Sequence, residues 1–200
     1  MSPFELGVAT FVLPGQSASG DHHLVAGKND IFLIAAVDGI GHGAEAASAA
    51  KAAISVLECA VEEPVISLVE RCHQKLRGTR GIVLSLASLD TRHGMMTWLG
   101  VGNVRGVLLR AATGKEKPRE ELLLRGGVVG SQLPPLQAIV LPFAWDDTLV
   151  FATDGIRGDF GETLSPRESP QRAAERILEQ YGTATDDALV LVARLAKPRP

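Results

Sequence analysis

Two apolar stretches of the chain end in the same three residues. Phe32–Val37 is an unbroken apolar run that leads into Asp38-Gly39-Ile40, and Leu149–Ala152 leads through Thr153 into Asp154-Gly155-Ile156. Short continuous apolar runs that end at turn residues are typical of buried strands. The pattern therefore predicts two buried strands, each of which delivers a carboxylate into a turn that contains glycine.

Three other segments show the spacing of amphipathic helices. Their apolar residues recur every three to four positions, which gives one apolar face. Proline in the first turn and glycine just past the end are typical helix boundaries, and serine is a common N-cap. The expected helices run from Gly43 to about Glu62, from Pro64 to Gly78 and from Ser169 to Gly182.

The rest of the chain has the pattern of strands joined by short connections. The additional strands expected are Glu5–Leu13, His22–Val25, Gly81–Leu89, Met95–Val101, Val104–Arg110, Glu121–Arg125, Gln137–Phe143 and Ala188–Leu195. Short connections favour antiparallel pairing, and strands segregated from helices favour an α+β fold in which sheet packs on helices. Residues 111–120, rich in Lys, Gly and Pro, are expected to form a solvated loop.

Composition narrows the class of protein. A chain of 200 residues suits one domain over residues 1–200, with residues 196–200 as a tail. The net charge of −3 gives no reason to expect nucleic acid, and no apolar run approaches the ~20 residues of a membrane helix. The N-terminus lacks the pattern of a signal peptide. Cys59 and Cys72 fall on predicted helices and suit buried thiols in a reducing compartment, so we expect a cytoplasmic protein.

Acidic residues mark the ends of several predicted strands. Asp21, Asp38 and Asp154 lie at or near a strand end or a turn, and Asp186-Asp187 precedes the last strand. The start of one antiparallel strand and the end of its neighbour share a sheet edge, so these side chains can converge. Clustered carboxylates stay ionised only beside a cation, and oxygen ligands favour Mg²⁺ or Mn²⁺. Four carboxylates balance two divalent ions, an arrangement that activates water and holds phosphate oxygens.

Four short motifs occur in a characteristic order. Ser19-Gly20-Asp21, Val37-Asp38-Gly39-Ile40-Gly41-His42-Gly43, Thr153-Asp154-Gly155 and Thr185-Asp186-Asp187 span nearly the whole chain. Together they resemble the metal-dependent serine/threonine protein phosphatases of the type-2C (PPM) superfamily, in particular its SpoIIE-like branch. The resemblance implies a layered α-β-β-α sandwich of two antiparallel sheets flanked by helices. It also implies hydrolysis by water that two divalent ions, Mn²⁺ or Mg²⁺, activate.

The same resemblance implies roles for individual residues. Asp38 corresponds to the carboxylate that bridges the two metals, and the Gly39 carbonyl is a further ligand. Asp21 assists one ion, and Asp154 and Asp186 hold the other. Asp38 and Asp154 are the expected catalytic residues. The second acid of the Asp186-Asp187 pair is the alternative ligand.

The chain also departs from the family pattern. The turn Gly102-Asn103-Val104-Arg105 stands where Gly-Asp-Ser-Arg is usual, and no arginine precedes Asp21 to bind the substrate phosphate. Ile40 occupies the position of the catalytic histidine of eukaryotic members. His42 is offset from it by two residues, and together with Gly41 and Gly43 it is the expected substrate-binding segment.

No sensor domain is expected beside the catalytic unit. That minimal form resembles the RsbX type, a feedback phosphatase of the stressosome, which implies phosphorylated STAS-domain proteins as partners. A monomer that binds neither nucleic acid nor membrane is expected. Alternatives are a phosphatase of an anti-sigma-factor antagonist or a catalytically weak docking protein. A dinucleotide-binding protein is a further alternative, because Gly39–Ala44 fits G-x-G-x-x-A between strand and helix, although Asp38 would repel a pyrophosphate.

Overall fold

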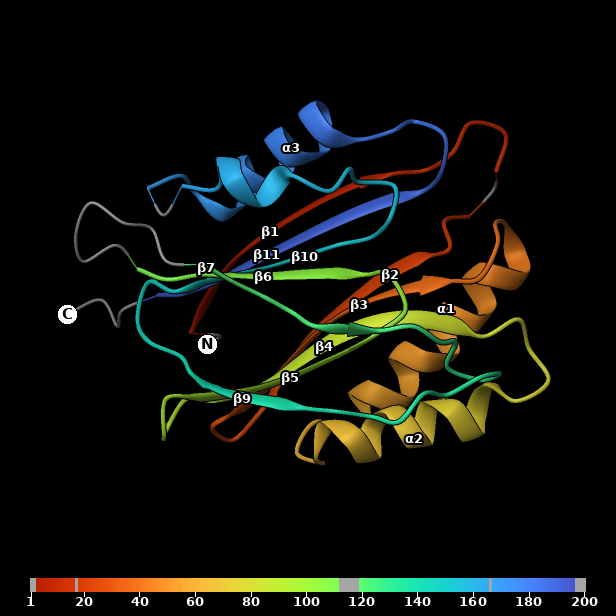
Figure 1. The fold of residues 1–200 in the computed structure, drawn as a ribbon, viewed down its shortest axis with the longest axis horizontal. Coiled ribbons are helices and arrows are strands. Elements are labelled where there is room, and N and C mark those ends of the chain that lie inside the picture. Colours follow the sequence, from red (N-terminus) through yellow and green to blue (C-terminus); the bar gives the residue numbers. More distant parts are fainter. Residues whose placement is uncertain (1–2, 17, 112–118, 166, 197–200) are drawn as a thin grey trace.

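Two β-sheets pack face to face, and helices cover both outer faces (Figure 1). The computed structural model describes residues 3–16, 18–111, 119–165 and 167–196. The helix α3 (Pro170–Tyr181) covers one sheet, and α1 (Ala44–Glu58) and α2 (Val65–Leu76) cover the other. The predicted α-β-β-α sandwich is confirmed. No helix in the described ranges has the length and apolar character needed to cross a membrane.

The two sheets differ in how their strands run. The five-stranded sheet is antiparallel throughout, in the order β1 (Phe4–Phe11), β11 (Ala188–Leu195), β10 (Thr148–Ala152), β6 (Arg105–Leu109) and β7 (Arg119–Glu121). The six-stranded sheet contains β2 (Asp21–Lys28), β3 (Ile31–Gly39), β4 (Ile82–Asp90), β5 (Met95–Val101), β8 (Leu124–Arg125) and β9 (Ile139–Pro142). Its long strands are antiparallel, but β8 runs parallel to β5, so this sheet is mixed.

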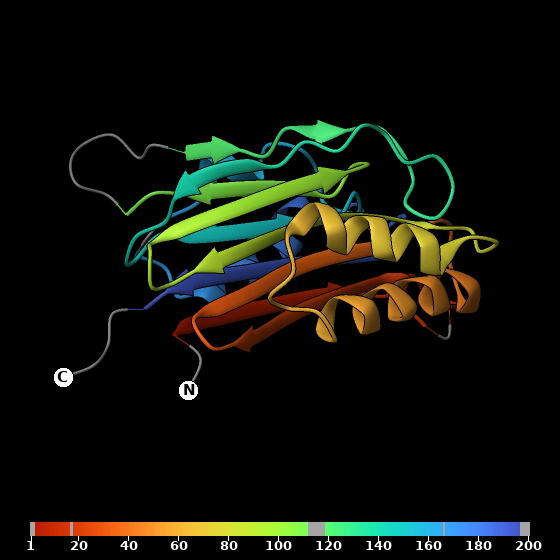
Figure 2. The same cartoon turned by 90° about the horizontal axis from the view of Figure 1, so that it is seen from below.

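Alternate residues of each central strand face different layers. In β3, Leu33 and Val37 pack in the core beneath α1 and α2, whereas Ile34 and Ala36 lie in the core between the sheets. A third core joins the five-stranded sheet to α3. Figure 2 shows α1 and α2 side by side across the outer face of the six-stranded sheet. This alternation decides which side chains of a strand reach the space between the sheets.

The first predicted helix ends earlier than expected. It stops at Glu58, and residues 59–63 form turns before α2. Pro64 disfavours a helical conformation in the residue before it and lies at the N-cap position of α2, one residue before the first turn. Cys59 therefore lies beyond the helix and is exposed, so the prediction of a buried thiol was wrong there. Cys72 is buried on α2 as predicted.

The predicted strand Glu121–Arg125 is divided between the two sheets. β7 ends at Glu121 and pairs with β6, whereas β8 begins at Leu124 and pairs with β5. Leu122 donates its backbone N–H to the Gly106 carbonyl and is buried between the sheets, while Leu123 is exposed. The chain passes from the five-stranded to the six-stranded sheet here. Leu122 and Leu124 both pack in the core between the sheets. Most of the predicted loop 111–120, namely 112–118, lies outside the described residues, as do tail residues 197–200.

Candidate metal-binding site between the sheets

Asp21 and Asp38 lie directly opposite each other on neighbouring strands. Asp21 is the first residue of β2, Asp38 is the last but one of β3, and the antiparallel register pairs them. Residues paired in this way point to the same face of a sheet. Asp38 lies on the same face of β3 as Ile34 and Ala36, which pack in the core between the sheets. The carboxylates of Asp38 and of its partner Asp21 therefore point toward the space between the two sheets.

The facing sheet brings its own acids to this end of the molecule. Thr153-Asp154 follows β10 and Asp186-Asp187 precedes β11, its antiparallel neighbour. The Thr153 N–H donates to the Leu189 carbonyl across 3.1 Å, which keeps the two segments together. The four acidic segments expected from the sequence are therefore brought together at one end of the sandwich.

A buried hydrogen bond connects the two sheets at this point. The Thr153 hydroxyl donates to Asp21 Oδ2 across 2.7 Å. Thr153 and Asp21 are only 1% and 7% exposed, so water cannot replace this bond easily. This role of Thr153 was not predicted, although its place immediately before Asp154 in the apolar-Thr-Asp-Gly motif was a signal.

Burial and mutual repulsion raise the pKa values of these carboxyls. Burial raises the pKa of Asp21 to about 7, the Thr153 hydrogen bond opposes that rise, and neighbouring carboxylates add to it. Burial, then the charges of Asp21 and the other acids, raise the pKa of Asp38 to about 8. The pKa of Asp154 is raised by loss of hydration and by Asp186. These shifts show that the site disfavours several negative charges unless a cation compensates them.

Asp187 is committed to hydrogen bonds within the protein. Its two carboxylate oxygens accept the backbone N–H groups of Leu13 and Gly20, each across 2.8 Å, and the residue is 5% exposed. It thereby fastens the β1–β2 connection beside Asp21. Asp186 is exposed, and its Oδ1 accepts the Asp187 N–H across 2.8 Å. Asp186 is thus the member of the pair with more free oxygen lone pairs.

Asn103 orients Asp154. Its side-chain Nδ2 donates to Asp154 Oδ2 across 2.8 Å, and this hydrogen bond lowers the pKa of Asp154 against the effects that raise it. From the sequence, Asn103 is predicted only as part of a turn. The signal was its place in the segment where related phosphatases carry Gly-Asp-Ser-Arg.

Both glycines that follow strand-end acids are required by close packing. A Cβ on Gly39 would lie 2.2 Å from the Ala46 carbonyl oxygen of α1, and a Cβ on Gly155 would lie 2.1 Å from the Asp187 carbonyl oxygen. Neither contact is possible for a real side chain. The repeated Asp-Gly therefore lets α1 and the segment before β11 approach the strand ends that carry Asp38 and Asp154.

The predicted substrate-binding segment forms the loop from β3 to α1. Gly41 and Gly43 have φ of 91° and 77°, which favours glycine. His42 is exposed, and its Nδ1 lies 3.2 Å from Gln16 Nε2 in the β1–β2 connection. This contact of Gln16 was not predicted. The loop lies beside the acidic cluster, and a role in substrate binding stays a prediction.

The donor set fits a hard divalent cation. The carboxylates of Asp21, Asp38, Asp154 and Asp186, with the Gly39 carbonyl, offer only oxygen, as Mg²⁺ and Mn²⁺ prefer. Within the described ranges, no three His, Cys, Asp or Glu side chains converge closely enough to hold an ion as they stand. Ligation would therefore require side-chain rotation, which is easy for the exposed Asp154 and Asp186.

The fold matches solved structures over almost its whole length. The structure described as "Crystal structure of RsbX in complex with magnesium in space group P1" superposes with a TM-score of 0.84 at 22% identity, covering 96% of each chain. The PP2C phosphatase domain of SpoIIE from Bacillus subtilis superposes with a TM-score of 0.74 at 19% identity, covering 98% of this chain and 64% of that one. At these identities the likeness concerns the fold. The fold is thus that of the PP2C-type phosphatase domains.

Sequence comparison identifies the family to which the chain belongs. The model of the family "Stage II sporulation protein E (SpoIIE)" matches residues 28–196, and the chain belongs to this family. A structure described as "The bacterial stressosome: a modular system that has been adapted to control secondary messenger signaling" is 32% identical, with a TM-score of 0.86, covering 96% of this chain and 99% of that one. The phosphoserine phosphatase RsbX of Bacillus subtilis (strain 168) is 31% identical over 94 residues, 47% of each protein. The matched region thus spans about half the length of that curated relative.

The dinucleotide-binding alternative was wrong. That site requires parallel strands on either side of the glycine-rich turn. Both neighbours of β3 run antiparallel to it, as the registers with β2 and β4 show.

Proposed function

We propose that the protein is a metal-dependent phosphoserine/phosphothreonine protein phosphatase that acts on phosphorylated STAS-domain stressosome proteins. The observation that carries the proposal is the pairing of Asp21 with Asp38 beneath Thr153, facing Asp154 and Asp186. Membership of the SpoIIE family supports the reaction class. The likeness to RsbX and to a structure whose description names the bacterial stressosome supports the partner.

Both sheets supply proposed metal ligands. Asp38 would be the carboxylate shared by two ions, and the Gly39 carbonyl would be a further ligand. Asp21 would assist one ion, and Asp154 and Asp186 would hold the other. When bound, divalent ions neutralise charge on the phosphoryl oxygens and lower the pKa of the attacking water. Titration of the activity with Mn²⁺ and with Mg²⁺ distinguishes the ion that the protein uses.

The chain's own residues prepare the site for this chemistry. Burial keeps water away from Asp21 and Asp38, which strengthens their attraction for a cation. Thr153 holds Asp21 in place, and Asn103 does the same for Asp154. Neither Cys59 nor Cys72 is required as a nucleophile, because the reaction needs no phosphoenzyme. We further propose that the protein is cytoplasmic and monomeric and that it contacts neither nucleic acid nor membrane.

Hydrolysis assays test the proposal directly. We expect the protein to release phosphate from p-nitrophenyl phosphate and from a phosphorylated STAS-domain protein with Mn²⁺ or Mg²⁺, and to lose both activities in EDTA. Asp38→Asn should abolish turnover in a folded protein. The matched control is Asp90→Asn, a change at the opposite end of the same sheet. Activity that persists in folded Asp38→Asn, or phosphate release that does not depend on metal, would contradict the proposal. Binding of the STAS-domain protein without turnover would identify a docking protein instead.

A further inference from the structure

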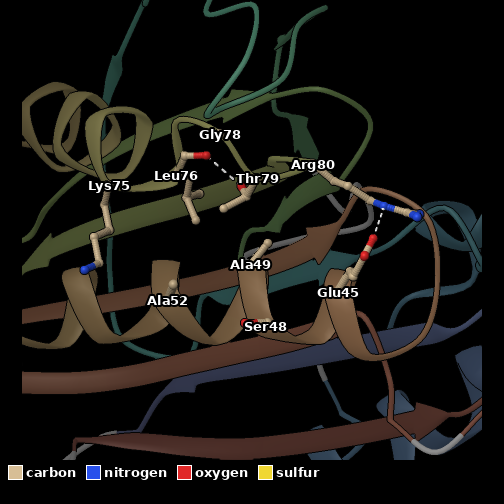
Figure 3. A pocket seen from close by; sticks show the side chains of 9 residues that line it. All are labelled: Glu45, Ser48, Ala49, Ala52, Lys75, Leu76, Gly78, Thr79 and Arg80. Atoms are coloured by element: carbon tan, nitrogen blue, oxygen red, sulfur yellow. Dashed lines mark hydrogen bonds and ion pairs between the residues drawn. The ribbon is translucent and has the colours of Figure 1, made fainter.

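A pocket of about 630 Å³ lies between the first half of α1 and the turn that follows α2 (Figure 3). Its polar lining residues are Glu45, Ser48, Lys75, Thr79 and Arg80, and small or apolar side chains complete it. Figure 3 shows Arg80 and Glu45 at one end and Lys75 at the other. The volume falls in the range that commonly accommodates small ligands or a few side chains of a partner.

One end of this pocket adjoins the glycine loop of the candidate site. A Cβ on Gly41 would lie 2.6 Å from Arg80 Nη1, so the guanidinium rests against the Gly41 backbone. The Ile40 N–H donates to the Gly81 carbonyl across 3.1 Å, which fixes the two loops side by side. A polypeptide that reaches Asp38 over this loop would therefore pass Arg80.

The pocket does not open toward the carboxylates themselves. α1 and α2, which line it, cover the outer face of the six-stranded sheet, whereas Asp21 and Asp38 face the space between the sheets. Arg80 thus lies at the end of the six-stranded sheet, beside the proposed site of phosphate hydrolysis but not within it. Its place suits an anionic group carried near the phosphorylated residue, and not the phosphate that is removed.

Arg80 is held by a partner that it can release. Its Nε lies 2.6 Å from Glu45 Oε2, and the two side chains are 51% and 71% exposed. Ion pairs this exposed contribute little, so exchange of Glu45 for another carboxylate has a small cost. Glu45 stays stabilised meanwhile, because it lies in the first turn of α1 near the positive end of the helix dipole.

Arg105, another arginine near the site, is less free. Arg105 lies over the Phe160 ring, 5.2 Å from its centroid, and its side chain is 29% exposed. Its Nη2 lies 3.8 Å from Glu121 Oε2. The stacking on Phe160 gives Arg105 a structural role that Arg80 lacks.

We propose that this pocket is a docking subsite for the substrate polypeptide beside its phosphoserine or phosphothreonine, and that Arg80 binds a carboxylate there in exchange for Glu45. A guanidinium binds a carboxylate through two parallel hydrogen bonds, which gives direction as well as charge. The inference rests on the proposed phosphatase function and adds a preference for an acidic residue near the phosphorylation site.

Phosphopeptides that differ in one residue test this preference. In one series a single glutamate is moved along the positions on both sides of phosphoserine, and in the matched series glutamine takes its place. For wild type we expect about a five- to tenfold higher kcat/KM for the glutamate peptide at one position, mainly through KM. Arg80→Ala should lose this preference and retain its activity on p-nitrophenyl phosphate. Arg77→Ala, which removes an exposed cation from the same turn, should keep the preference.

Charge reversal provides the second test. Arg80→Glu should favour a peptide with lysine at the same position, which a merely structural role of Arg80 would not produce. Equal preference in wild type and Arg80→Ala would overturn the inference, and so would a parallel loss of p-nitrophenyl phosphate turnover in Arg80→Ala. Lack of turnover by wild type on every substrate would overturn the phosphatase function, and this inference with it.

Discussion

Thr153 holds Asp21 from across the interface between the two sheets. Its hydroxyl donates to Asp21 Oδ2 across 2.7 Å, and its Oγ1 accepts the Leu189 N–H across 2.8 Å. Thr153 follows β10, Asp21 begins β2 and Leu189 lies in β11. One buried hydroxyl thus ties three strands together at the candidate metal site. The position of the carboxylate consequently depends on how the two sheets pack.

Replacement of Thr153 by valine should weaken both the fold and metal binding. Valine keeps the shape but leaves the Leu189 N–H and Asp21 Oδ2 without their partner, which should destabilise the protein by about 1–3 kcal/mol. The pKa of Asp21 should rise further, because the lost hydrogen bond lowers it. Urea unfolding and Mn²⁺ titration of activity measure the two effects. Thr153→Ser, which retains the hydroxyl, is the control, and equal behaviour of the valine and serine variants would contradict the argument.

The raised pKa values predict how stability depends on pH without metal. The pKa of Asp38 rises from 3.8 to about 8 and that of Asp21 to about 7. Between about pH 4 and pH 8 the folded state therefore binds more protons than the unfolded state. Stability should fall as pH rises through this window and level off above it. Melting temperatures measured in EDTA across this range test the slope, and a stability that rises with pH there would contradict it.

Asp38→Asn should remove part of that slope. The amide stays neutral, so the variant should melt a few degrees above wild type in EDTA at about pH 9, where about 2–4 °C corresponds to about 1 kcal/mol. Asp90→Asn is the control, because hydrogen bonds from His93 lower the pKa of Asp90 instead of raising it. A variant with Asn at position 38 that melts below wild type at this pH would show that Asp38 is not a destabilising charge.

Hydrophobic pattern and glycine placement were enough to predict most of the strands, and to place Asp21, Asp38 and Asp154 at or near strand ends or turns. They could not tell which face of β3 meets the second sheet, because Leu33 and Ile34 are equally apolar. The side that Asp38 faces was therefore not predictable. The contact of Thr153 with Asp21 depends on the packing of the two sheets, and no local pattern encodes it.

The division of the strand predicted at Glu121–Arg125 has a similar cause. Three consecutive leucines, Leu122–Leu124, give no alternation that would mark the crossing between sheets. Asp186 and Asp187 are likewise the same residue type. What distinguishes them is hydrogen bonding of Asp187 to Leu13 and Gly20, 174 and 167 residues away in the chain.

Replacement of Asp187 should therefore lower stability, whereas replacement of Asp186 should abolish metal-dependent activity. Asp187→Ala removes the acceptor of two N–H groups, those of Leu13 and Gly20, and should destabilise the protein by about 2–4 kcal/mol. Asp186→Ala changes an exposed side chain and should leave stability within about 0.5 kcal/mol while it abolishes metal-dependent activity. Denaturant unfolding and phosphate release of both variants make the comparison. The assignment is reversed if Asp186→Ala unfolds more easily and Asp187→Ala retains stability but loses metal binding.

Asn103 offers the most selective way to change metal binding without changing the fold. It is exposed and donates to Asp154 Oδ2 across 2.8 Å, a hydrogen bond that both orients this carboxylate and lowers its pKa. Asn103→Ala should raise the Mn²⁺ concentration for half-maximal activity by about tenfold or more, as is common when a group that supports a metal ligand is lost. The melting temperature should hardly change. Because the pKa of Asp154 rises in this variant, activity at fixed Mn²⁺ should recover as pH increases. A requirement for Mn²⁺ equal to that of wild type at every pH would show that Asn103 does not support Asp154 in the active protein.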